Sequence, residues 1–199
     1  MSKANKVAQF LNLIEKEAHN FGAEVLYHSK RFIKVSPNMH VSGFWDGDAK
    51  QINVAVYCDE WLTILAHEFG HLCQQREKKF IDTATTNAYI YFDEWLLGER
   101  ELSKKRLDDV CELIQICELD CEKRALKLIK KFNLYSSDSL YIQKANSYVL
   151  GYEAAKVSRK WFKRSPSGQK EVYSIMSKKF TRTLTPNKKR LQALLISCF

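Results

Sequence analysis

The stretch that organises this chain is Leu65-Ala66-His67-Glu68-Phe69-Gly70-His71-Leu72. Residues four apart lie on the same face of an α-helix, so His67 and His71 would direct two imidazoles towards one point. Glu68 follows His67 directly, and its carboxylate would lie beside that point. Asp59 is expected to cap this helix, which should run to about Glu77.

Two imidazoles beside a carboxylate predict a zinc site, with His67 and His71 as ligands and Glu68 as general base. A catalytic zinc ion usually has three protein ligands and one water. The metzincin pattern would place the third ligand six positions after His71, but that residue is Glu77, so this class is excluded. For the other histidines we expect surface or structural roles: His19, His28 and His40.

The best third ligand lies in a long helix expected over residues 104–132. Glu118 falls in the apolar stripe of this helix, where a carboxylate is costly unless it is paired or bound to a cation. Small neighbours would let the helix approach the histidine helix closely: Cys117, Cys121 and Ala125. Glu122, one turn further on, would orient a ligand imidazole. Two alternatives stay open: Glu118 pairs with a lysine or arginine, or Glu94 is the ligand instead.

Other patterns place secondary structure on both sides of this core. Residues 4–19 have a helical apolar period that Gly22 ends, and three β-like segments follow at 25–27, 31–35 and 52–57. Turn signals at 36–38 and 46–48 separate them, which predicts a small antiparallel or mixed sheet. Residues 80–103 are aromatic-rich and broken at Gly98. A helix should run from a cap at Asp138 or Ser139 to about Phe162.

The last part of the chain is strongly basic. A break at 165–168 leads to helically spaced apolar residues (172, 175, 176 and 180), and Pro186 should precede a last short helix. Residues 156–190 hold twelve Lys and Arg and one acid, a local charge of +11 in a chain of net +9. Such a segment could meet nucleic acid or another anionic surface, or serve as a solvated face.

The chain is expected to be α+β. A small N-terminal sheet would pack on the histidine helix, and a mostly helical half would follow. We expect a domain over residues 1–155, with its core at about 50–132. A basic helical segment, 156–199, would fold separately or pack on the same domain.

The composition of the chain limits its domain size, its cellular location and the state of its cysteines. With 199 residues and 45% hydrophobic content, the chain is long enough for one domain with a full core. No apolar run reaches the length of a membrane span, and the N-terminus has no signal-peptide core, so we expect a cytoplasmic protein without a membrane partner. The six cysteines form no CxxC pair and read as reduced, mostly buried thiols.

These residues resemble gluzincin-type metallopeptidases, most of all the compact ImmA/IrrE-like peptidases and their phage-encoded relatives. Those families carry HExxH on one helix and a glutamate ligand on a later helix, in the pattern ExxA(N/D)xxA. Residues 118–125 match at Glu118 and Ala125 and depart at Cys121 and Glu122. The gap of 47 residues from His71 to Glu118 is longer than usual, so 80–103 would be an insertion. The resemblance covers about residues 50–130.

The resemblance implies a minimal zincin-like domain and a zinc-dependent peptidase that acts on a specific protein or peptide substrate. It would work in the cytoplasm, or in the host cytoplasm if a phage or mobile element encodes it. His67, His71 and Glu118 would hold Zn²⁺, and Ile52–Tyr57 would be the edge strand that binds an extended peptide. A transition-state donor is also expected, and Tyr148 or Tyr152 could serve, although buried tyrosines more often only pack in a core.

Two other functions remain open. The chain could be a non-catalytic phage or mobile-element protein on a zincin scaffold, binding nucleic acid or a partner protein through residues 156–190. It could also be a zinc hydrolase that acts on something other than peptides. The basic segment would serve the peptidase too, by bringing it to targets bound to nucleic acid, as in SprT-like proteases.

Overall fold

A computed structural model describes residues 2–36, 39–78, 83–181 and 187–199, and its fold is the expected α+β class. Pro37, Asn38 and Pro186, on which expectations rested, lie outside the described residues. In chain order the elements are α1 (Lys3–Asn20), β1 (Glu24–His28), β2 (Ile33–Ser36), β3 (Met39–Val41), β4 (Gly43–Asp46), β5 (Gln51–Ala55), α2 (Trp61–Arg76), α3 (Thr83–Leu97), α4 (Lys104–Phe132), α5 (Asp138–Ser158), the 3₁₀ helix η1 (Pro166–Gly168), α6 (Lys170–Tyr173) and α7 (Lys188–Cys198).

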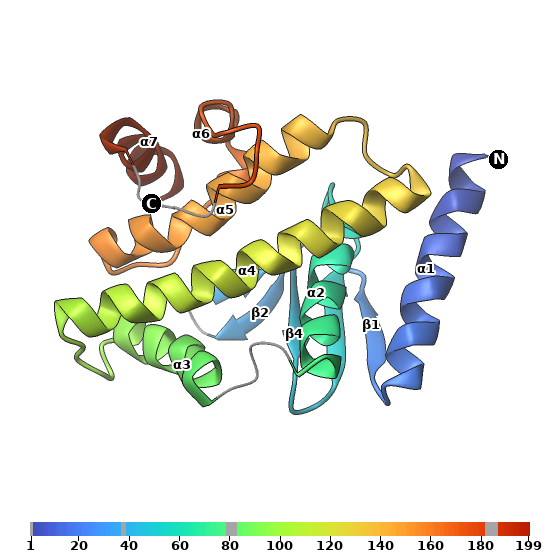
Figure 1. Ribbon diagram of the computed structural model, residues 1–199, viewed down its shortest axis with the longest axis horizontal. Coiled ribbons are helices and arrows are strands. Elements are labelled where there is room, and N and C mark those ends of the chain that lie inside the picture. Colours follow the sequence, from blue (N-terminus) through green and yellow to red (C-terminus); the bar gives the residue numbers. More distant parts are fainter. Residues whose placement is uncertain (1, 37–38, 79–82, 182–186) are drawn as a thin grey trace. The chain divides into compact units, whose positions relative to one another are not determined.

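Two compact units divide the chain, and each is built from two separate stretches. The first unit comprises residues 1–79 and 121–136, and the second comprises 80–120 and 137–199. The long helix α4, whose expected bounds are confirmed, contributes its last turns to the first unit and its earlier turns to the second (Figure 1). Among the described residues, no helix is both long and apolar enough to cross a membrane.

The first unit holds a mixed three-stranded sheet in the order β1-β5-β4. β1 runs parallel to β5, and β4 runs antiparallel to it. A separate antiparallel pair is formed by β2 and β3. Residues Ile52–Ala55 of β5 are all buried, as a central strand requires. The helix α1 lies beside β1, with Phe10, Ile14 and Ala18 turned into the core.

The expectation that Ile52–Tyr57 forms the edge of the sheet is wrong. β5 is central, and the edge beyond it is β4, which the sequence pattern did not indicate. β4 spans only Gly43–Asp46, and its glycine and aspartate are disfavoured in strands, so no alternating pattern reveals it. The expected turn after it is present, since Asp46 Oδ1 accepts hydrogen bonds from the backbone N–H groups of Asp48 and Ala49.

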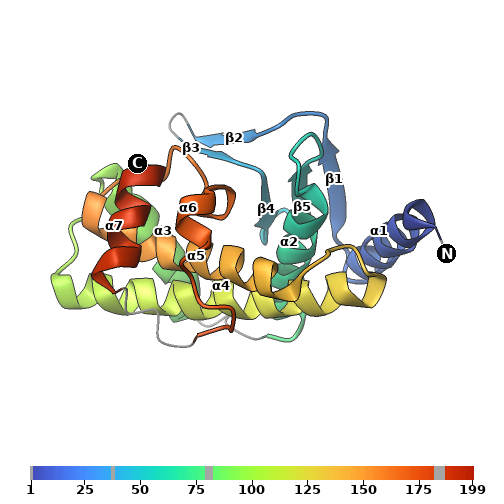
Figure 2. The same cartoon turned by 90° about the horizontal axis from the view of Figure 1, so that it is seen from above.

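Helix α2 packs against β4 and β5, as Figure 2 shows. Asp59 does not cap it, contrary to expectation: the N-cap position is Glu60, whose side chain makes no capping hydrogen bond. Asp59 instead lies 3.6 Å from the Arg31 guanidinium. The helix ends at Arg76, with Glu77 as C-cap, close to the expected end.

Helices α2 and α4 approach each other closely at Gly70. A Cβ at this position would lie 3.2 Å from Cys121 Cα and 3.3 Å from Cys121 O. The two backbones are therefore almost in contact, which the absence of a side chain at Gly70 permits, and Cys121 is one of the small residues at which a close approach was expected. Phe10 of α1 and Phe132 of α4 add an edge-to-face ring contact at 5.7 Å between centroids.

The second unit has a helical core of its own. Buried side chains of α3, α4 and α5 form one cluster: Ala88, Phe92, Trp95, Leu107, Val110, Cys111, Ile114, Tyr152 and Ala155. Residues 80–103, which were hard to interpret, thus contain a packed helix, and Gly98 follows it with φ of +78°. All six cysteines of the chain are free thiols, and five are buried.

Helix α5 begins and ends earlier than expected. Its N-cap is Ser137, whose hydroxyl accepts a hydrogen bond from Leu140 N, and not Asp138 or Ser139. It ends at Ser158 and not at Phe162, because Arg159 has the left-handed φ of +51°. The Arg159 guanidinium holds this turn by donating to Trp95 O and to Glu101.

The C-terminal helices pack on α5 in the second unit through a further buried cluster: Leu150, Ala154, Val172, Met176, Leu194 and Cys198. The helical spacing from Val172 to Phe180 overstated the structure, since α6 stops at Tyr173. Buried amides of α5 bind the carbonyls beyond that point. Gln143 donates to Ser174 O and Met176 O, and Asn146 donates to the carbonyls of Ser177 and Lys179.

The close approach of α2 and α4 at Gly70 predicts that a branched side chain at this position destabilises the fold. Gly70→Val should lower the free energy of unfolding by about 1–3 kcal/mol, because its added carbons overlap the α4 backbone. Urea unfolding in EDTA measures this without a contribution from bound metal. Gly168→Val is the control, since nothing lies within 4 Å of a Cβ there. Equal stability of the two variants would show that α2 and α4 separate easily.

Candidate metal centre

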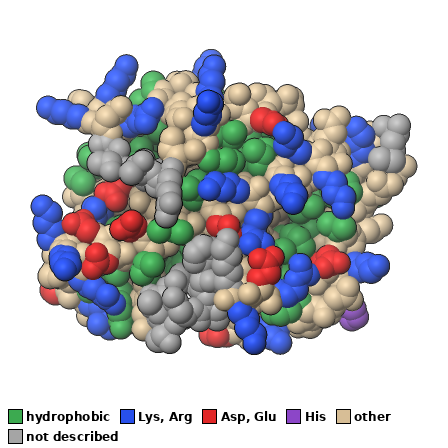
Figure 3. All heavy atoms as spheres, viewed as in Figure 1, with side chains coloured by type: hydrophobic (Ala, Val, Ile, Leu, Met, Phe, Trp, Pro, Cys, Tyr) green, Lys and Arg blue, Asp and Glu red, His purple; other side chains and the backbone are tan. Residues whose placement is uncertain are grey.

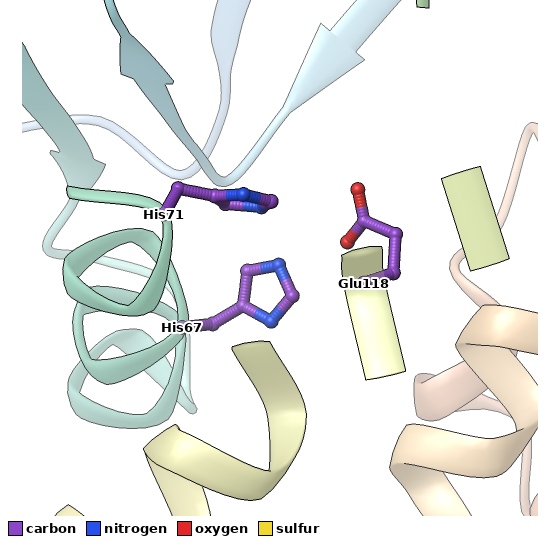
Figure 4. A group of neighbouring side chains, drawn as sticks. All are labelled: His67, His71 and Glu118. Atoms are coloured by element: carbon purple, nitrogen blue, oxygen red, sulfur yellow. The ribbon is translucent and has the colours of Figure 1, made fainter. Parts of the chain in front are cut away.

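Three predicted ligands come together in the structure. One nitrogen each of His67 and His71 and one oxygen of Glu118 all lie within 4.8 Å of one another, and the side chains face one another in Figure 4. No other group of three such side chains occurs among the described residues. His67 is 8% exposed and Glu118 is 3% exposed, so these two donors are largely shielded from water, while His71 is half-buried. Two imidazoles and one carboxylate suit Zn²⁺.

Helix α2 supplies both histidines from one face. The four-residue spacing brings the two rings to 5.0 Å between centroids, with their planes at 77°. The flanking apolar residues Leu65 and Leu72 are fully buried, which fixes the rotation of the helix about its axis. The histidines therefore project in a direction set by the hydrophobic core.

Glu122, which was expected to orient a ligand imidazole, lies beside His67. Its Oε1 is 3.2 Å from His67 Nδ1, and both side chains are about one-tenth exposed. A carboxylate beside Nδ1 fixes the ring orientation and favours a proton on that nitrogen. Nε2 of His67 is then the nitrogen that would bind the ion.

The second histidine makes two side-chain contacts that sequence reasoning did not predict. His71 Nδ1 lies 3.2 Å from Gln74 Oε1 and 3.2 Å from Cys121 Sγ. Because an amide oxygen only accepts hydrogen bonds, the Gln74 contact favours a proton on Nδ1, and Nε2 would then keep a lone pair for a metal ion. Gln74 lies three residues after His71, on the same face of α2, and that spacing was the signal available in the sequence.

Glu118 is held by phenol groups. Tyr89 OH donates to Glu118 Oε1 at 2.8 Å, and Tyr152 OH lies 3.4 Å from the same oxygen. Burial raises the pKa of both tyrosines well above the usual range, and the Glu118 charge raises it further. Both phenols therefore keep their protons and remain donors. Tyr148, the other tyrosine considered, has its OH 3.4 Å from Tyr152 OH.

Glu68 lies between α2 and the edge strand. It is 7% exposed, and a Cβ at Gly43 of β4 would lie 3.3 Å from Glu68 Cγ. The same Cβ would overlap Ile64 Cγ2, at 2.5 Å. The absence of a side chain at Gly43 thus makes room for the side chains of Ile64 and of Glu68, the predicted general base.

The remaining candidates lie elsewhere. His28 Nε2 and Asn53 Oδ1 are 2.9 Å apart, and His19 and His40 are exposed. Glu94 accepts a hydrogen bond from the Arg100 guanidinium, and it is not part of the group that His67 and His71 form with a carboxylate. Among the described residues, the geometry therefore favours Glu118 over Glu94 as the third donor.

The chain matches no protein-family model, no curated protein and no solved structure. The resemblance to gluzincin-type peptidases accordingly remains a prediction. What the site can do chemically follows from its own donors: two imidazoles and a carboxylate around one point, with a further carboxylate one residue from the first histidine.

The Glu122 contact predicts a change in zinc affinity. Glu122→Ala should weaken zinc binding by about 10–100-fold, because His67 loses the group that sets its orientation and tautomer. Competition with a chromogenic chelator measures the affinity. Glu112→Ala, an exposed glutamate of the same helix, should leave it unchanged. Unaltered affinity in Glu122→Ala would mean that His67 is positioned by its backbone alone.

Proposed function

We propose that this protein is a zinc-dependent peptidase. The observation that carries the proposal is the convergence of His67, His71 and Glu118 donor atoms within 4.8 Å, with Glu68 next to His67 on the same helix. This arrangement combines three ligands for one ion with a carboxylate on the residue next to the first of them. Such a set is what metal-assisted hydrolysis requires.

Each residue has a distinct role in this proposal. His67, His71 and Glu118 would hold the ion, and Glu122 and Gln74 would keep the two imidazoles in the ligand tautomer. Zinc, when bound, lowers the pKa of a bound water to about 7 and polarises a carbonyl. Glu68 would accept a proton from the attacking water and pass it to the leaving amine.

The edge strand supports a peptide as substrate. Among the described strands, β4 pairs only with β5, so its other side offers backbone groups to an extended chain. Main-chain hydrogen bonds would hold such a peptide, and Gly43 of β4 lies next to Glu68. We therefore propose β4 as the strand along which the substrate lies, in a cytoplasmic enzyme with a specific protein substrate.

Metal content and peptide cleavage together test this function. We expect about one zinc per chain in the wild type and in Glu68→Gln, and none in His67→Ala or Glu118→Ala, by elemental analysis. Cleavage of a proteome-derived peptide library, followed by mass spectrometry, should be at least about 100-fold slower with Glu68→Gln, because a positioned general base contributes 10²–10⁴-fold.

The Glu68→Gln variant is also the control for contaminating proteases, since it differs from the wild type by one carboxylate oxygen. Absence of zinc from the wild type after incubation with the metal would refute the proposal. Equal rates of cleavage by the wild type and Glu68→Gln would refute the peptidase function but would not contradict the metal site.

The basic segment supports a second candidate function, the binding of nucleic acid. Exposed Lys and Arg side chains of this segment lie on and between the C-terminal helices: Arg159, Lys160, Lys163, Arg164, Lys170, Lys178, Lys179, Lys188 and Lys189. Figure 3 shows Lys and Arg side chains projecting where α6 and α7 lie, while Asp and Glu side chains are visible over other parts of that face. Phosphate backbones bind such surfaces.

This second function predicts salt-dependent binding of duplex DNA, measured by fluorescence anisotropy. The double variant Lys178→Ala/Lys179→Ala should weaken DNA binding. It should also make the slope of log K against log salt concentration about 2 units shallower, because each lost phosphate contact changes that slope by about 0.9. Lys104→Ala/Lys105→Ala removes an exposed pair outside the segment and is the matched control. If the wild type binds no DNA at low salt concentration, this second function is refuted, and the basic segment is a solvent-exposed face of the protein.

A further inference from the structure

Helix α3 brings a tyrosine to the carboxylate that would bind the metal. Tyr89 OH donates to Glu118 Oε1 at 2.8 Å, the usual length for a hydrogen bond between hydroxyl and carboxylate oxygens. Tyr152 OH, from α5, lies 3.4 Å from the same oxygen, which makes it the weaker donor. Two phenols thus converge on one oxygen of Glu118.

The position of Tyr89 is fixed by packing. Ala88, Phe92 and Trp95 of α3 are buried in the helical core of the second unit, with exposed fractions of 6% or less. Phe92 and Tyr152 are in ring contact, with 5.6 Å between their centroids. Because the neighbouring side chains of α3 are immobilised in this core, the Tyr89 phenol is presented to Glu118 from a rigid support.

The hydrogen bonds also decide how Glu118 can bind an ion. A carboxylate oxygen has two lone pairs, and Oε1 has two phenol donors facing it. An ion would therefore meet the other oxygen, Oε2. If Glu118 bound through one oxygen, the three residues would supply three ligand atoms, which is the number that catalytic zinc sites use when they also bind a water or a substrate.

We propose that Tyr89 is a positioning residue that restricts Glu118 to binding the metal through a single oxygen, with Tyr152 in a lesser supporting role. This inference rests on the proposed metal site and goes beyond it. It gives a function to residues 83–97, which separate the histidines from Glu118 in sequence. The helix is then part of the metal centre and not a spacer.

The test compares Tyr89→Phe, Tyr152→Phe and Tyr91→Phe with the wild type. Tyr91 lies on the same helix as Tyr89, and its ring contacts the Arg100 guanidinium. Zinc affinity is measured by competition with a chelator. The coordination number is measured with Co²⁺ in place of zinc, because four-coordinate Co²⁺ absorbs visible light far more strongly than five-coordinate Co²⁺. Circular dichroism in EDTA checks that each apo-protein is folded.

We expect Tyr89→Phe to weaken zinc binding by about 10–100-fold and to reduce the visible Co²⁺ absorption, as Glu118 is released to bind through both oxygens. Tyr152→Phe should have a smaller effect, and Tyr91→Phe none. Zinc affinity and a Co²⁺ spectrum in Tyr89→Phe equal to those of the wild type would overturn the inference while leaving the metal site intact. An unfolded Tyr89→Phe apo-protein would also overturn it, since the phenol would then serve the fold. A wild type that binds neither metal would overturn the inference and the proposed function together.

Discussion

The near-contact of α2 and α4 at Gly70 is the constraint on which the site depends. With Cys121 Cα 3.2 Å from where a Cβ at Gly70 would be, the two helices cannot come closer, and a larger residue would push them apart. Cys121 has Glu118 one turn before it and Glu122 directly after it on α4. The approach therefore places two carboxylates of one helix beside the two imidazoles of another. The glycine between the histidines is as much a part of the site as the ligands.

The electrostatics of this site favour a bound cation. Glu68, Glu118 and Glu122 are each less than a tenth exposed, and all three lie on the two helices that carry the site. Buried carboxylates are costly, and neighbouring ones repel each other, unless positive charge or hydrogen bonds offset the cost. The Tyr89 phenol and the His67 imidazole each face one of these carboxylates. A divalent cation among the donors would supply the remaining compensation.

Local patterns predicted the helices α1, α2 and α4 and singled out His67, His71 and Glu118, whereas α3, the order of the strands and the contacts between distant segments could not be read from them. The apolar stripe of residues 104–132 gave the bounds of α4 and singled out Glu118, because a carboxylate within such a stripe needs a partner. The central position of β5 depends on pairing with β1 and β4, and that order is set by tertiary packing. Asp59 is not the cap because α2 begins one residue later than expected, with Glu60 at the N-cap position, while the Asp59 carboxylate lies 3.6 Å from the Arg31 guanidinium.

Two consecutive turns of α4 make different contacts at the candidate metal centre. Glu118 receives hydrogen bonds from the phenols of α3 and α5, whereas Cys121 and Glu122, one turn on, contact the imidazoles of α2. Because both sets of residues lie on one continuous helix, the helical rise and rotation fix their positions relative to each other. The long interval between the histidines and Glu118 in sequence is therefore no obstacle to a precise site. Part of this interval forms α3, whose buried side chains pack in the core of the second unit and whose Tyr89 donates a hydrogen bond to Glu118.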